Sequence, residues 1–119
     1  MKKLEFEYFD EEEFEEFLDA LSRKESQKLL ATIYKVEQWG LTKAQRQKWV
    51  KKLENNLYEI RSEYSSNNTR AVYFHFTDNH YVITHGFKKK TQKTPPREIL
   101  KGVNRRNDYL KRNGRNGSN

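Results

Sequence analysis

Basic side chains stand at one end of each of three strands that the sequence predicts in its second half. They are Arg61 at the end of the first of these strands, Arg70 at the start of the second, and Lys88, Lys89 and Lys90 after the third. In an antiparallel meander the end of one strand lies beside the start of the next, and the third strand returns to the same edge. The sequence therefore predicts that these cations meet at one edge of a sheet.

A cluster of guanidinium and ammonium groups suits the chemistry of a phosphodiester. Arginine stays charged and can hold two phosphate oxygens at once, and such groups also stabilise the extra negative charge of a transition state. A lysine among other cations can have a lowered pKa, because like charges disfavour its protonated form, and could then act as a general base near neutral pH. The alternative is that Arg61 and Arg70 form surface ion pairs with Glu59 and Glu63.

The charge of the chain is unevenly distributed. Its net charge of +7 combines 6 basic and 11 acidic side chains in residues 1–37 with 18 basic and 6 acidic side chains in residues 38–119. Residues 87–119 alone carry 11 basic and 2 acidic side chains, so a polyanion is the natural partner for this part. The solvated lysine face of an ordinary soluble protein is the simpler alternative.

The length and composition predict one compact domain. A chain of 119 residues is the size of a single ordinary domain, and aromatic residues make up 13% of it, more than disordered chains usually contain. No apolar run approaches the roughly 18 residues of a membrane span, and the first residues lack the apolar stretch of a signal peptide. We therefore expect no membrane association and a cytoplasmic location.

The sequence lacks the residues that several kinds of site require. Without cysteine there is no disulfide, thiol nucleophile or thiolate metal site. The histidines show no metal-ligand spacing, and His75 and His85 lie in apolar strands, where packed histidines are commoner than catalytic ones. The glycines form no phosphate-binding loop. We therefore expect no metal ion and no cofactor.

Hydrophobic periodicity in the first half predicts a strand and a helical hairpin. A half-buried strand over residues 2–9 precedes a helix that Asp10 caps, and a second helix ends at Gly40. The apolar stripes of these helices are Phe14, Phe17, Leu18 and Leu21, followed by Leu29, Leu30, Ile33, Tyr34 and Val36. Thr42 is expected to cap a further short helix that reaches Leu53.

The second half predicts a three-stranded antiparallel meander followed by a helix, which completes an α+β fold. The strands are expected at residues 57–61, 70–76 and 81–87, with turns at 65–69 and at Asp78-Asn79. The last two strands are almost wholly apolar, so both faces of the sheet should be covered. Pro95 and Pro96 start the final helix, whose expected stripe is Ile99, Leu100, Val103 and Leu110. We assign residues 1–112 to one domain and 113–119 to a flexible tail.

The strings LYEIR, TRAVYF, THGFKKKTQKTPPREI and NRRNDY occur in an order that resembles the RelE/ParE superfamily, and within it the phage-derived HigB-like toxins. The resemblance covers roughly residues 4–110 and is strongest at GFKKKTQKTPPREI. It implies a RelE-like toxin of a type II toxin–antitoxin system. Such a toxin is a ribosome-dependent mRNA endoribonuclease, or mRNA interferase, and inhibits translation through metal-independent attack by the RNA's own 2′-hydroxyl.

The same resemblance implies partners and site residues. The partners are a HigA-like helix-turn-helix antitoxin, the ribosome and its mRNA, with operator DNA reached only through the antitoxin. The implied catalytic residues are Arg61, Arg70, Lys88 and Lys89, and the implied RNA-binding residues are Lys90, Lys93 and Arg97. Tyr109 falls on the last helix and is no certain counterpart of the C-terminal catalytic tyrosine of some members. The alternative functions are a gyrase-directed ParE-like toxin and a non-catalytic nucleic-acid-binding module.

Overall fold

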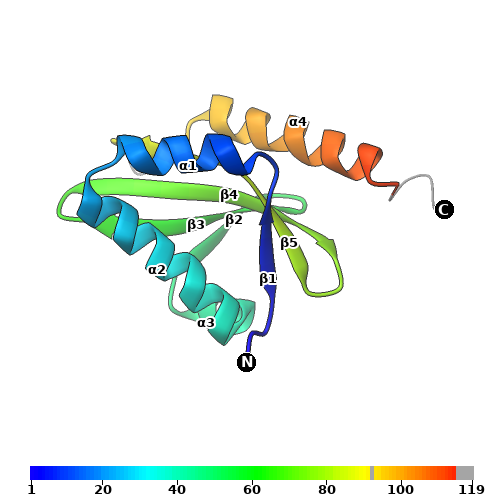
Figure 1. The fold of residues 1–119 in the computed structure, drawn as a ribbon, viewed down its shortest axis with the longest axis horizontal. Coiled ribbons are helices and arrows are strands. Elements are labelled where there is room, and N and C mark those ends of the chain that lie inside the picture. The colour runs from blue at the N-terminus through cyan, green and yellow to red at the C-terminus, as the bar shows by residue number, and fades with distance from the viewer. Residues whose placement is uncertain (92, 115–119) are drawn as a thin grey trace.

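The computed structural model describes residues 1–91 and 93–114. In this part of the chain a five-stranded sheet combines with four helices (Figure 1). In chain order the elements are β1 (Glu5–Tyr8), α1 (Glu11–Ala20), α2 (Arg23–Trp39), α3 (Leu41–Arg46), β2 (Val50–Glu54), β3 (Leu57–Tyr64), β4 (Asn67–Thr77), β5 (His80–Lys89) and α4 (Pro96–Arg112). The expected α+β class is confirmed.

The sheet has the strand order β1-β5-β4-β3-β2. Strands β2 to β5 form an antiparallel meander, whereas β1 pairs in parallel with β5, from Glu5 beside His80 to Tyr8 beside Ile83. Helices α1, α2 and α3 carry the chain from β1 at one edge of the sheet to β2 at the other edge. The helical segment therefore allows the first strand to join the same sheet as the meander.

Helices cover both faces of the sheet, as the apolar strands predict. On one face, Phe14, Ile33 and Ala44 of helices α1, α2 and α3 join the larger buried cluster. On the other face, α4 packs against a second buried cluster. Helix α4 approaches the sheet closely at Gly102, where a Cβ atom would lie 2.9 Å from Cγ1 of Val72. A larger side chain at this position would force the helix and the sheet apart.

The boundaries of the first two helices follow local capping signals. The side chain of Asp10 accepts a hydrogen bond from the backbone N–H of Glu13, as predicted, and the acidic first turn of α1 suits the positive end of the helix dipole. Ser22 and Glu25 form a capping box at the start of α2. Gly40 ends α2 with a φ of 88°, in the region that favours glycine. Local sequence is therefore sufficient to place these helix ends.

The short helix predicted from Thr42 is present as α3, but its N-cap is Gly40 and its predicted end at Leu53 is wrong. Helix α3 ends at Arg46, and residues 50–54 form strand β2. The chain turns at Asn56, which has a φ of 46°, and β2 then pairs with β3. The meander consequently has four strands and not three. A short, mostly polar strand has little preference of its own, so its pairing with β3 decides its structure.

Of the two predicted turns of the meander, one lies where it was predicted and the other is shorter than predicted. The turn expected at residues 65–69 is shorter, because β4 already begins at Asn67 and pairs with Tyr64. The turn at Asp78-Asn79 joins β4 to β5 as predicted, and Asp78 has a φ of 50°. The longer strands extend the sheet toward the end at which the cations were expected.

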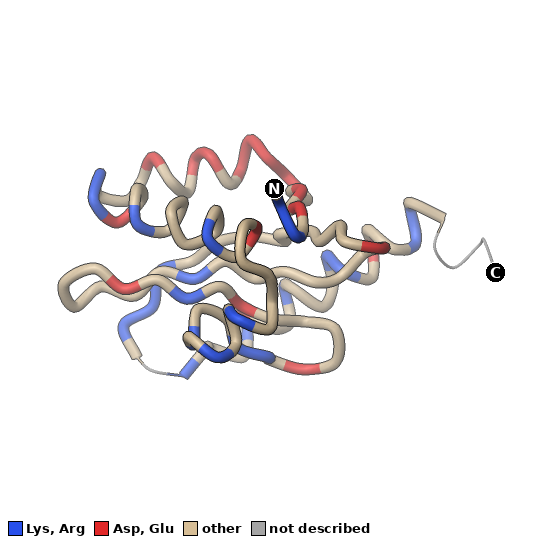
Figure 2. The backbone as a smooth tube through the Cα atoms, turned by 90° about the horizontal axis from the view of Figure 1, so that it is seen from below, with Lys and Arg blue, Asp and Glu red and all other residues tan. Residues whose placement is uncertain are grey.

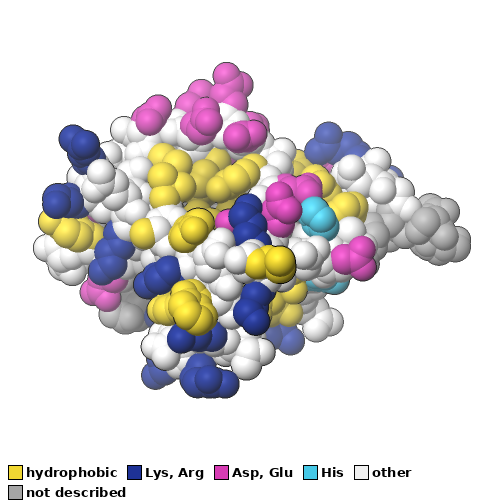
Figure 3. Space-filling view, turned by 60° about the horizontal axis from the view of Figure 1, so that its bottom comes forward, with side chains coloured by type: hydrophobic (Ala, Val, Ile, Leu, Met, Phe, Trp, Pro, Cys, Tyr) yellow, Lys and Arg dark blue, Asp and Glu magenta, His cyan; other side chains and the backbone are white. Residues whose placement is uncertain are grey.

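The buried stripes of α2 and α4 are narrower than the periodicity predicts. Leu30, Tyr34 and Leu100 are 42%, 59% and 59% exposed. The buried positions of α2 include Glu25 and Thr32, and the buried position of α4 is Gly102, so several apolar positions of both helices remain on the surface. Figure 3 shows hydrophobic side chains gathered in a hollow beside a row of acidic side chains.

No helix in the described part of the chain is long and apolar enough to cross a membrane. Residues 115–119 of the expected tail lie outside the described residues.

Candidate nucleic-acid interface

The strand register brings the predicted cations to the same end of the sheet. The Cα partners at this end are Arg61 with Arg70, Arg70 with Phe87, Thr69 with Lys88, and Asn68 with Lys89. We call this end, defined by Arg61, Arg70 and Lys88–Lys90, the basic corner. Figure 2 shows that acidic residues gather on helix α1, whereas basic residues are spread over the sheet and its loops. The meeting of the cations at one sheet end matches the topological prediction.

The side chains of the basic corner lie on two faces of the sheet. Because side chains alternate along a strand, Arg61, Arg70 and Lys89 project from the face that α4 covers. Lys88 projects from the opposite face, where its ammonium lies 3.0 Å from Oε2 of Glu25 on α2. A backbone N–H of the α2 capping box and the ammonium of Lys88 lower the pKa of Glu25. Lys88 is therefore paired with a helix end and not grouped with the arginines.

Arg70 is enclosed in the protein. It is 3% exposed, and its Nη1 donates to the carbonyl oxygens of Ser62 and Thr69 at 3.2 and 2.9 Å. Its Nε lies 3.6 Å from Oε2 of Glu59, which is also buried. Burial lowers the pKa of Arg70, and the charge of Glu59 acts against that shift. The pairing of Arg70 with Glu59 is therefore present, but inside the protein and not on its surface.

Lys89 joins the same buried cluster through Thr94. The ammonium of Lys89 donates to Oγ1 of Thr94 at 3.4 Å, and the Thr94 hydroxyl donates to Oε1 of Glu59 at 2.7 Å. Burial, followed by the charge of Arg70, lowers the pKa of Lys89, as expected for a lysine among other cations. The sequence did not indicate Thr94 as a site residue, because its hydroxyl meets Glu59 only in the folded chain.

Three cavities open around the basic corner. Their basic lining residues are Lys48, Arg61 and Arg70 in a cavity of about 240 Å³, Lys88, Lys89, Lys90 and Arg97 in one of about 290 Å³, and Lys51, Lys52 and Lys93 in one of about 160 Å³. Every residue that the sequence resemblance assigned to catalysis or RNA binding lines one of them. An extended anion could therefore contact several of these cation-lined cavities at once.

Lys48, Lys51 and Lys52 are part of this surface but are absent from the sequence prediction. The helix expected there distributes them around its axis, whereas β2 places Lys51 beside Glu59. The signal that could have located them is the strand-like VKKLE followed by Asn55-Asn56, a pair typical of turns. A helix at this place would not bring the three lysines to the sheet, so the sequence prediction does not include them.

The sequence matches a protein family over most of its length. Residues 16–107 match the model of the family described as Phage derived protein Gp49-like (DUF891). The chain belongs to this family. The Gp49-like family is a RelE/ParE-like toxin family of toxin–antitoxin systems, and its matched span contains the whole basic corner. A comparison with curated proteins finds no match.

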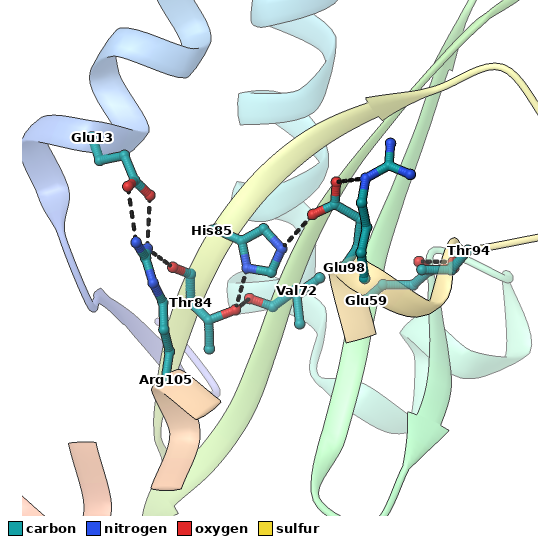
Figure 4. Close-up of polar contacts among 9 residues, drawn as sticks. Glu13, Glu59, Val72, Thr84, His85, Thr94, Glu98 and Arg105 are labelled. Carbon is teal, nitrogen blue, oxygen red and sulfur yellow. Dashed lines mark hydrogen bonds and ion pairs between the residues drawn. The ribbon is translucent and has the colours of Figure 1, made fainter. Parts of the chain in front are cut away.

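In this member of the Gp49-like family a second polar network, buried at Thr84 and His85 and partly exposed at Glu13 and Arg105, joins α1, β5 and α4 (Figure 4). Nε2 of His85 lies 3.0 Å from Oε1 of Glu98, and Nδ1 lies 2.8 Å from Oγ1 of Thr84. Arg105 on α4 donates to the carbonyl oxygen of Thr84 at 2.9 Å and to both carboxylate oxygens of Glu13 at 2.7 and 2.9 Å. The network holds the first turn of α4 in place, directly after the loop that leads from the basic corner.

His85 is neutral in this network. Burial and the nearby charge of Lys101 lower the pKa of His85 to about 3. Because the carboxylate of Glu98 can only accept, Nε2 carries the ring proton and donates it. The single proton of the Thr84 hydroxyl is then shared between Nδ1 at 2.8 Å and the carbonyl oxygen of Val72 at 3.3 Å. His85 is thus a packed, hydrogen-bonded histidine, as expected from its place in an apolar strand.

The other histidines lie at the far end of β4 and β5. Nε2 of His75 lies 2.7 Å from the carbonyl oxygen of Asp78, and Nδ1 of His80 lies 3.0 Å from a carboxylate oxygen of Glu7. Among residues 1–91 and 93–114, no group of three or more His, Cys, Asp or Glu side chains is placed to hold a metal ion. His75 and His80 therefore stabilise a turn and a strand edge, away from the basic corner.

The free energy of unfolding should decrease in acid because of His85. An unfolded histidine has a pKa near 6.5, so the unfolded chain binds more protons than the folded chain between about pH 6.5 and 3. The part of the free energy of unfolding that comes from His85 is fully present above pH 6.5. It decreases by at most about 1.4 kcal/mol for each pH unit as the pH falls toward 3. Urea unfolding between pH 8 and pH 4 measures this loss.

Replacement of His85 by Gln should make the pH dependence of unfolding less steep. The matched control is His80→Gln, because His80 is partly exposed and lies outside the network. Equal slopes for the wild-type protein and His85→Gln would contradict the assignment of this acid sensitivity to His85.

Proposed function

We propose that this protein is a HigB-like toxin of a type II toxin–antitoxin system and cleaves mRNA on the ribosome. The observation that supports this proposal most directly is the group of cations on one face of the basic corner. Arg61 and Arg70 are neighbours that line one cavity, and Lys89 belongs to the same buried cluster as Arg70. Membership of a RelE/ParE-like toxin family supports the toxin role.

The proposed reaction needs one proton acceptor and several positive charges. The 2′-oxygen of a nucleotide forms a bond to the adjacent phosphorus, the bond from that phosphorus to the 5′-oxygen of the next nucleotide breaks, and this oxygen takes up a proton from water. We assign removal of the 2′-hydroxyl proton to Lys89, because its lowered pKa leaves more of it neutral than an ordinary lysine. Arg61 and Arg70 would stabilise the charge that develops on the phosphoryl oxygens.

The remaining basic residues would hold the RNA backbone. Lys90 in the basic corner is exposed, and so are Lys93 and Arg97 in the segment that follows it. A catalytic role for Lys88 would require its ion pair with Glu25 to open, so we place Lys88 among the RNA-binding residues. This division assigns charge stabilisation to Arg61 and Arg70 and RNA affinity to the exposed cations.

The partners follow from the same proposal. The toxin family implies an antitoxin, and we propose that it is a HigA-like helix-turn-helix protein that silences the toxin and alone contacts operator DNA. The ribosome would present the mRNA, and a protein acting there would work in the cytoplasm. No metal ion or cofactor enters the proposed reaction.

A purified translation reaction tests the proposed function. The mRNA should be cut only when ribosomes and this protein are both present, and the new ends should be a 2′,3′-cyclic phosphate and a 5′-hydroxyl. Equal cutting of free RNA would contradict ribosome dependence. Intact mRNA together with inhibited DNA gyrase would indicate the ParE-like alternative, and RNA binding without cutting would indicate a binding module.

Replacing Lys90, Lys93 or Arg97 by Gln should make RNA binding less dependent on salt. Each phosphate contact releases condensed counterions, and the slope of log K against log salt concentration changes by about 0.7 per contact on a single strand. Fluorescence anisotropy with a labelled RNA measures the slope, and Lys111→Gln on the last turn of α4 is the control. Unchanged slopes in all three variants would make these side chains ordinary solvated surface.

A further inference from the structure

We infer that Glu59 and Thr94 are positioning residues, which hold Lys89 and Arg70 in the arrangement that RNA cleavage requires. This inference rests on the proposed function and adds two residues to it. Both residues are buried, at 1% and 6% exposure, and neither reaches the RNA in our proposal. They would act only through the cations that they contact.

Glu59 interacts with both Arg70, the proposed charge-stabilising residue, and Lys89, the proposed base. One carboxylate oxygen lies 3.6 Å from Nε of Arg70, and the other accepts the hydroxyl of Thr94, which in turn accepts from Lys89. Two buried cations therefore depend on one buried carboxylate, Arg70 directly and Lys89 through the hydroxyl of Thr94.

Thr94 can serve this cluster because a hydroxyl both donates and accepts. It donates to Glu59 at 2.7 Å and accepts from Lys89 at 3.4 Å (Figure 4 shows the first of these bonds). Thr94 directly precedes Pro95, the N-cap of α4, and a residue before proline is restricted to extended backbone. The start of α4 therefore determines where the hydroxyl lies, and through it the position of the Lys89 ammonium.

Charged groups from every neighbouring strand act on Lys89. Arg70 on β4, Arg61 on β3 and Lys51 on β2 disfavour its ammonium form, while Glu59 on β3 favours it. Lys88 and Lys90 flank it along the chain. Because Glu59 is the carboxylate among these groups, its neutralisation should lower the pKa of Lys89 further. A base with a lower pKa is deprotonated at lower pH, so the acid side of the pH–rate profile should move to lower pH.

The experiment compares Thr94→Val, Thr94→Ser and Glu59→Gln with the wild-type protein in the purified translation reaction. Thr94→Val keeps the shape of the side chain but forms neither hydrogen bond, so kcat should fall at least 10-fold while KM for programmed ribosomes changes less than twofold. Thr94→Ser restores the hydroxyl and should be within about threefold of wild type. Glu59→Gln should shift the acid side of the kcat profile to lower pH.

The outcomes separate this inference from the proposed function. If the wild-type protein cuts mRNA and Thr94→Val is equally active, or if Thr94→Ser is as impaired as Thr94→Val, the positioning role is wrong. If the wild-type protein cuts no RNA, the proposed function fails. NMR titration of the Lys89 side chain then still tests the contact with Glu59, because an unchanged titration in Glu59→Gln overturns the inference. Circular dichroism verifies folding, and Thr94→Ala replaces Thr94→Val if the latter is unfolded.

Discussion

Replacing Arg61 by Ala should lower the rate of mRNA cleavage by about 100-fold or more while leaving the free energy of unfolding nearly unchanged. Arg61 is partly exposed and lines the cavity of about 240 Å³ beside Arg70. Loss of one hydrogen-bond donor to a developing oxyanion typically reduces kcat by about 100- to 1000-fold. Single-turnover cleavage and urea unfolding of the same preparation would measure the two effects independently.

Two further variants make the Arg61 experiment specific. Arg61→Lys keeps the charge but cannot hold two phosphate oxygens in the same way, so its rate should lie between those of the wild type and Arg61→Ala. Arg46→Ala removes an exposed arginine from the last turn of α3 and should have no effect on cleavage. If Arg61→Ala cleaved mRNA as fast as the wild type, Arg61 would not contact the reacting phosphate.

Replacing Arg70 by Leu should abolish cleavage and also destabilise the fold by about 3–5 kcal/mol. This is the usual cost of removing one partner of a buried ion pair, because the charge of Glu59 would remain buried without its arginine. The carbonyl oxygens of Ser62 and Thr69 would also lose a donor. Unfolding in guanidinium chloride measures the change. Arg70 thus differs from Arg61, whose loss should affect activity alone.

A double-mutant cycle shows whether the buried charge causes this instability. Combining Arg70→Leu with Glu59→Leu removes both charges of the pair, so the free energy of unfolding should fall by less than the sum of the two single losses. If the losses of unfolding free energy in the two single variants simply add up in the double variant, Arg70 and Glu59 do not stabilise each other. In that case the instability of Arg70→Leu would come from packing around the removed side chain.

Short-range patterns were sufficient for much of the fold. The caps at Asp10 and Gly40 and the proline start of α4 depend on residues a few positions apart, and such signals can be identified in a sequence. Two almost wholly apolar strands around Asp78-Asn79 similarly indicated a hairpin, which the structure contains. Strand β2 was missed because its five residues become a strand through pairing with β3, an interaction that no local pattern records.

The sequence by itself determined that Arg61, Arg70 and the lysines at the end of the last strand meet at one sheet end, because the order of antiparallel strands dictates which ends are neighbours. Tertiary structure alone decided their surroundings. It enclosed Arg70 with Glu59, joined Lys89 to Thr94, and paired Lys88 with Glu25 on the opposite face. Each of these contacts depends on which helix or loop covers a given face, and that choice follows from the packing of the whole chain and not from residues near one another in sequence.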